Sequence, residues 1–92
     1  MPDPIVMEPR MDLSTVEFFV QSMLVQATEG RIVLDGSNVT HLGALCAQAI
    51  ISAARTVGDA GGSLEITDLS DRASQQLKCM GLTPEILAEG AR

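Results

Sequence analysis

The chain has 92 residues, which is enough for one folded domain and too few for two. Its 12 acidic and 6 basic side chains give a formal net charge of −6, and the basic residues are scattered along the sequence. This charge repels phosphate backbones and anionic lipid headgroups, so we expect no nucleic acid and no membrane surface among its partners. The only aromatic residues are Phe18 and Phe19, so the core has to be aliphatic.

The first third of the chain predicts short edge strands followed by a helix. Three of the first nine residues are prolines, which donate no backbone hydrogen bond, so Ile5–Met7 and Arg10–Asp12 are expected to be edge strands. Ser14–Glu17 has the pattern of a capping box, and apolar residues follow at helical spacing as far as Leu24. A helix is therefore predicted from Ser14 onward, ending before Gly30.

The rest of the chain alternates between strand and helix patterns. Arg31–Asp35 contains consecutive aliphatic residues, which is typical of a central strand covered on both faces. A helix is predicted from about Gly43, a strand over Ser63–Thr67, and a third helix capped by Ser70 and ended by Gly81. This order predicts an α/β domain, with helices packed against a mixed β-sheet of about four strands.

We expect residues 1–92 to form this single domain, with loosely ordered tails at residues 1–4 and 83–92. The third helix is expected to turn Gln75 and Gln76 toward solvent on its polar side.

The residue types that catalysis or metal binding require are sparse. His41 is the single histidine, and no nucleophile with an orienting carboxylate can be assigned around it. Cys46 and Cys79 are too far apart in sequence for a metal knuckle or a CxxC pair, and we expect both thiols to be shielded on apolar helix faces. The glycines within residues 58–62 form no nucleotide-binding motif. We therefore expect no enzymatic activity, no metal and no cofactor.

The most informative segment is Val39–Ile51, because it joins a buried strand to an apolar helix through one short polar loop. Working sites of α/β folds are commonly built at such junctions. The run LGALCAQAI over Leu42–Ile50, followed by Gly61-Gly62, Leu64–Ile66 and Asp68–Ser70, resembles STAS domains, the family that includes anti-sigma-factor antagonists. The similarity extends over nearly the whole chain.

Within that family the chain is most similar to the small STAS proteins encoded in chemotaxis operons of alphaproteobacteria. In this group the phosphoacceptor dipeptide is commonly Gly-Gly or Gly-Ala, and a Leu-Cys pair and a glutamine follow. The corresponding residues here are Gly43 and Ala44, then Leu45, Cys46 and Gln48.

The resemblance also implies what the site does. In many STAS domains an Asp-Ser pair opens the second helix, and phosphorylation of the serine switches partner binding. Ala44 stands at the acceptor position and has no oxygen to accept a phosphoryl group, so the resemblance implies a docking surface without phosphorylation. The implied partner-binding residues are Val39, Thr40, His41, Leu42, Gly43, Ala44, Leu45 and Cys46.

We expect the protein to be a non-enzymatic protein–protein interaction module of bacterial signalling. The expected pathway is chemotaxis, and the expected partner is a histidine kinase or response regulator. Two alternatives remain: a STAS subunit of a phospholipid-transport ABC complex, and an anti-sigma-factor antagonist that works without phosphorylation. The N-terminus does not resemble a secretion signal, and no apolar stretch approaches the ~18–20 residues of a membrane span, so we expect a cytoplasmic protein.

Overall fold

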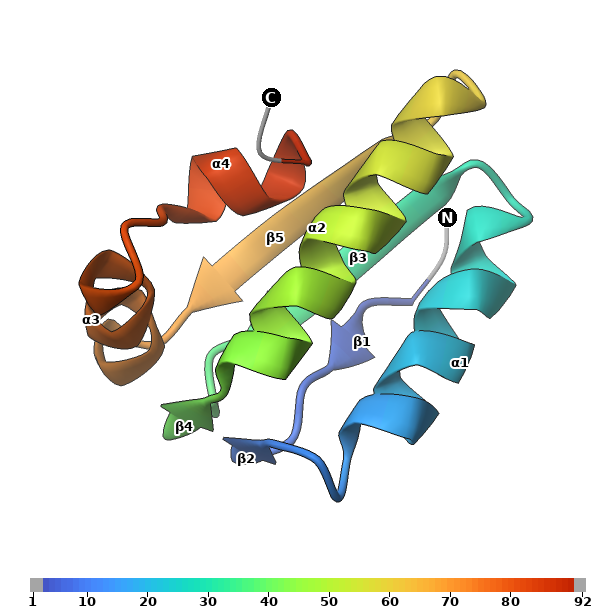
Figure 1. Ribbon diagram of the computed structural model, residues 1–92. Helices are drawn as coiled ribbons and strands as arrows, with labels where there is room; N and C mark the ends of the chain where they lie inside the picture. Colours follow the sequence, from blue (N-terminus) through green and yellow to red (C-terminus); the bar gives the residue numbers. More distant parts are fainter. Residues whose placement is uncertain (1–2, 91–92) are drawn as a thin grey trace.

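The computed structural model describes residues 3–90 and contains five strands and four helices (Figure 1). The strands are β1 (Ile5–Val6), β2 (Arg10–Met11), β3 (Arg31–Gly36), β4 (His41–Leu42) and β5 (Ser63–Leu69). The helices are α1 (Val16–Ala27), α2 (Ala44–Asp59), α3 (Asp71–Cys79) and α4 (Pro84–Ala88). The predicted α/β fold class is confirmed.

The strands form two sheets rather than the one mixed sheet that the sequence predicted. β1, β3 and β5 form a three-stranded sheet in the order β1-β3-β5, while β2 and β4 form a two-stranded sheet. All of these pairings are parallel. Pro9 lies between β1 and β2 and cannot donate to a ladder, so the N-terminal segment divides into two strands with different partners.

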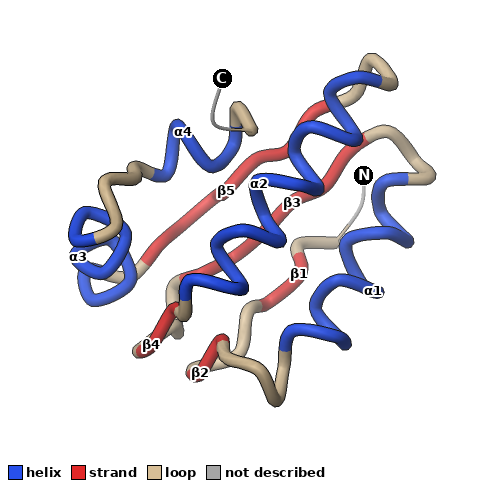
Figure 2. Tube along the Cα trace, in the orientation of Figure 1, coloured by secondary structure: helices blue, strands red, loops and turns tan. Residues whose placement is uncertain are grey.

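Helices α1 and α2 lie side by side over one face of the three-stranded sheet, and α4 packs against α2 and β5 (Figures 1 and 2). Parallel neighbours need a crossover connection, which α1 supplies between β1 and β3 and α2 supplies between β3 and β5. The unbroken apolar run Ile32–Leu34 in β3 is buried, as its sequence predicted. Ile32 and Leu34 of this run belong to one core cluster with Phe19, Met23, Cys46, Ile50, Val57 and Leu64.

The predicted capping box at the start of α1 does not form. The helix begins at Val16, and the side chain of its N-cap residue, Thr15, makes no cap hydrogen bond. The amide and the hydroxyl of Ser14 instead donate to Asp12 Oδ1, at 3.0 and 2.6 Å. The serine hydroxyl, together with the serine amide, holds the pKa of Asp12 below its usual value. A local side-chain turn has therefore displaced the expected cap.

The C-terminal segment is not the loose tail that the sequence predicted. Thr83 caps α4, because its Oγ1 accepts a hydrogen bond from the backbone N–H of Ile86 at 3.1 Å. Leu87 is 0% exposed and belongs to the core. Arg55 Nε, from α2, donates to the carbonyl oxygen of Gly90 at 2.7 Å. The segment through residue 90 is thus part of the domain.

The expected loose tails also included residues 1–4 and 91–92. Residues 1, 2, 91 and 92 lie outside the described residues. Asp3 is anchored, since its carbonyl oxygen accepts from Gln26 Nε2 at 2.6 Å, while Gln26 Oε1 accepts from the N–H of Val33 at 2.8 Å. One glutamine of α1 therefore ties the segment before β1 to β3.

The two cysteines differ, contrary to the prediction that both are shielded. Cys46 is buried, and desolvation raises the pKa of its thiol, whereas Cys79 is exposed. The buried residues of α3 are Ala73 and Leu77, four positions apart on one face. Cys79 comes two positions after Leu77 and so lies off that face.

Candidate partner-binding site

The predicted site, Val39–Cys46, lies at the carboxyl end of β3 and at the start of α2 (Figure 1). Val39, Leu42 and Cys46 were predicted to contact a partner, but they are core residues with exposures of 1%, 1% and 0%. Their side chains are therefore not available for such a contact. The other five residues are exposed or half-buried. We call them the α2-start surface: Thr40, His41, Gly43, Ala44 and Leu45.

The backbone before α2 is held on one side by the segment around β2. The N–H groups of Thr40 and His41 both donate to the carbonyl oxygen of Pro9, at 2.8 and 3.0 Å. Thr40 Oγ1 donates to the same oxygen at 3.0 Å, and the N–H of Gly43 donates to the carbonyl oxygen of Met11 at 2.8 Å. These bonds fix the path of the chain as it enters the helix.

Ser70, at the N-cap of α3, holds the same segment from the other side. Its hydroxyl donates to the carbonyl oxygen of Val39 and accepts from the N–H of Ala73. The sequence predicted the cap. The bond to the carbonyl oxygen of Val39, which lies 31 positions earlier in the chain, ties the cap to the candidate site.

Gln76, which the sequence did not indicate, also holds the segment of the candidate site. Its Oε1 accepts from the N–H of Leu42 at 2.6 Å, and its Nε2 donates to the carbonyl oxygen of Thr40 at 3.1 Å. The side chain was predicted to face solvent, but it closes one edge of β4 in the way that a neighbouring strand would. A polar residue on the polar side of an amphipathic helix gives no local sign of such a contact.

The start of α2 is open. Gly43 is its N-cap, no side chain caps the helix, and no acidic residue lies in its first turn. The first N–H groups of a helix lack partners within the helix and carry partial positive charge. A Cβ added to Gly43 would lie 3.2 Å from the carbonyl oxygen of Met11, so the close passage of β2 favours glycine there. Leu45, in the first turn of α2, is 49% exposed.

The thiol beside this surface is not activated for nucleophilic attack. Cys46 Sγ lies 3.7 Å from the carbonyl oxygen of Asp12 and donates to it, and burial raises the pKa of this thiol, which disfavours the nucleophilic thiolate. Within residues 3–90, no group of three or more histidine, cysteine or acidic side chains could hold a metal ion.

Replacing Gln76 by alanine should lower stability and loosen the segment before α2. The change leaves the N–H of Leu42 and the carbonyl of Thr40 without their side-chain partner, which costs about 1–3 kcal/mol. We expect urea unfolding to show a loss of that size, and hydrogen exchange to show faster exchange of the Leu42 amide. Gln75→Ala, which removes an exposed neighbour on α3, is the matched control. Equal effects of the two changes would contradict this role for Gln76.

The fold and the position of this surface define an α/β domain with its candidate site at the entry to the second helix. A family model described as Mlab, STAS domain, matches residues 6–88. The chain therefore belongs to the STAS domain family, whose members act in general as protein interaction and regulatory modules. No curated protein and no solved structure matches it. In the described part of the chain, no helix is long and apolar enough to cross a membrane.

Proposed function

We propose that this STAS domain is a non-enzymatic interaction module of bacterial chemotaxis signalling, and that it docks a histidine kinase or response regulator through the α2-start surface. The observation that supports this most is the anchoring of the surface from both sides, by Pro9 and Met11 on one side and by Ser70 and Gln76 on the other. A surface ordered before binding loses little conformational entropy when the partner arrives.

The contacts of the surface suit a small partner epitope with an acidic group. The uncapped start of α2 offers backbone N–H groups to a carboxylate, and the exposed part of Leu45 offers an apolar contact beside them. His41 is half-buried at the rim. We expect a modest interface, of the size that transient signalling complexes use.

Docking through this surface is independent of phosphorylation at the start of α2. Ala44 is exposed there and has no hydroxyl group. The nearby hydroxyl of Thr40 donates a hydrogen bond to the carbonyl oxygen of Pro9, so it is engaged in holding the loop. Partner access would then depend on the concentration or state of the partner rather than on modification of this chain.

Photo-crosslinking in cells tests this function. A photoreactive phenylalanine placed at Leu45 should capture a histidine kinase or response regulator, whereas the same residue at Thr56, exposed near the far end of α2, should not. Mass spectra of the captured complex should show no phosphate within residues 40–47. An ATPase subunit of a lipid transporter, or a sigma-factor regulator, at position 45 would replace the chemotaxis role by one of the two alternatives. Equal capture at both positions would contradict the docking surface.

A further inference from the structure

The outer edge of β1 is unpaired within the described chain and carries exposed apolar side chains. β1 pairs with β3 on one side only and lies at the end of its sheet. The N–H of Met7 donates to the carbonyl oxygen of Asp35 at 2.8 Å, so Met7 directs its backbone toward β3. Backbone groups alternate in direction along a strand, and those of Val6 therefore point outward. Val6 is 60% exposed, and Phe18 of α1 is 76% exposed.

A shallow hollow runs between this edge and α1. It is lined by residues of both, among them Val6, Glu8, Phe18 and Ser22. Its volume is only about 30 Å³, which is too small for an organic ligand. The combination of outward backbone groups and flanking apolar side chains fits an extended peptide lying along the edge instead.

The charge around the edge specifies the kind of peptide. Asp3 and Glu8 flank β1, and Glu17 precedes Phe18 on α1. Within residues 3–90 none of these three carboxylates forms an ion pair, while Arg10, the nearest cation in sequence, pairs with Asp12 at 3.4 Å. Of the three, Glu8 also lines the hollow beside β1, so the edge presents negative charge to an incoming chain.

We propose that the β1 edge binds an extended segment of a partner protein that has alternating apolar side chains and flanking lysine or arginine residues. The segment adds a strand beside β1, packs its apolar side chains against Phe18 and Val6, and places its basic residues near Asp3 and Glu8. A second copy of this chain fits less well, because antiparallel pairing of two β1 strands would bring the acidic residues of one copy against those of the other. This site is separate from the α2-start surface and does not depend on the proposed function.

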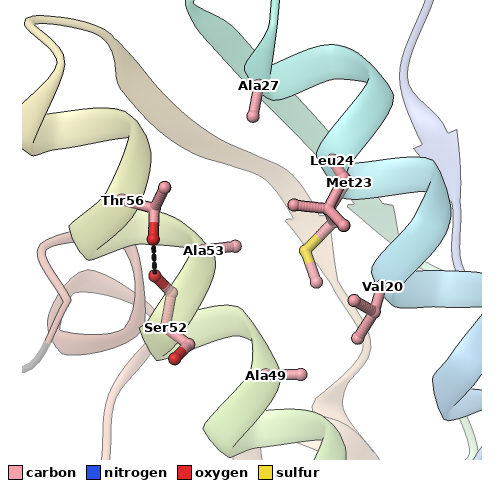
Figure 3. A pocket seen from close by; sticks show the side chains of 8 residues that line it. All are labelled: Val20, Met23, Leu24, Ala27, Ala49, Ser52, Ala53 and Thr56. Carbon is pink, nitrogen blue, oxygen red and sulfur yellow. Dashed lines mark hydrogen bonds between the residues drawn. The ribbon is translucent and has the colours of Figure 1, made fainter.

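A larger apolar groove between α1 and α2 provides the internal control. Its volume is about 360 Å³, and side chains of the two helices face each other across it (Figure 3). Leu24, which lines this groove, is 50% exposed and is an apolar residue of the same helix as Phe18. Nothing in the structure specifies an occupant for this groove, so Leu24→Ser serves as the matched control for Phe18→Ser.

The test uses a fluorescein-labelled peptide, Lys-Thr-Val-Thr-Val-Thr-Lys, titrated against the full chain by fluorescence polarisation. We expect saturable binding, slower hydrogen exchange of the Val6 amide, and binding at least about tenfold weaker when glutamate replaces the two lysines. Phe18→Ser should weaken binding by a similar factor and Leu24→Ser should leave it unchanged. Val6→Pro, which removes the outward N–H at a position where edge strands tolerate proline, should also weaken it.

Three results would overturn this proposal. One is tighter binding of the glutamate peptide than of the lysine peptide. Another is an equal effect of Phe18→Ser and Leu24→Ser in variants whose circular dichroism is unchanged. The third is that, in the absence of peptide, protection of the Val6 amide from hydrogen exchange increases with protein concentration. This result would show that a second copy of the chain occupies the edge.

Discussion

Replacing Ala44 by glutamate is expected to abolish partner binding while leaving the fold intact. The new carboxylate lies in the first turn of α2, where it competes with the partner's acidic group for the uncapped N–H groups and repels that group. The same charge interacts favourably with the helix dipole, so the free energy of unfolding should stay unchanged or rise by about 0.3–1 kcal/mol. Isothermal titration against the protein captured at position 45, together with urea unfolding, measures both effects.

Gln21→Glu is the control for this change. It adds the same charge at an exposed position on α1, away from the α2-start surface, so binding should remain at the wild-type level. Binding retained by the Ala44 variant, at a strength equal to that of the control, would show that the start of α2 is not the contact.

Replacing Leu87 by alanine should destabilise the domain by about 2–5 kcal/mol, the usual cost of truncating a fully buried leucine. Leu87 is 0% exposed, and its helix, α4, contacts both α2 and β5. A typical domain has a free energy of unfolding of about 5–15 kcal/mol, so a loss of this size is a large fraction of its stability. Chemical denaturation with urea, followed by circular dichroism, gives the free energy of unfolding directly.

Glu85→Ala, on the same helix, is the control. It shows whether a loss of stability in the Leu87 variant comes from the loss of a buried side chain or from any change in α4. Glu85 is exposed, and its replacement should change the free energy of unfolding by no more than about 0.5 kcal/mol. If both variants unfold at the same urea concentration as the wild type, then α4 is a dispensable tail and its packing against α2 does not stabilise the domain.

The sequence predicted those elements whose signals are local. The apolar run Ile32–Leu34 predicted the central strand, and Ser70 predicted the cap of α3. The sequence did not predict that the C-terminal segment is ordered, although Thr83-Pro84 carries a helix-start signal. Its order depends on Leu87 reaching the core formed with α2 and β5, which is a tertiary contact that a short acidic segment does not reveal.

The candidate docking segment was chosen from the sequence, but distant contacts determine which of its residues are buried and what holds them. Gln76 bonds to backbone groups 34 and 36 residues earlier in the chain, so hydrophobic periodicity carried no information about it. Val39 and Leu42 are buried because the segment passes between β2 and α3, and that path depends on the pairing of β2 with β4. A strand of two residues is too short for alternation to show which side chains point inward.

The most direct test of the proposed docking surface is an NMR titration of the isotope-labelled chain with the partner captured at position 45. We expect the largest shifts on the amides of Thr40, His41, Ala44 and Leu45. The amides lining the groove between α1 and α2 should remain unchanged. Largest shifts on α1 or α4, with the amides of residues 40–45 unaffected, would show that the partner docks elsewhere.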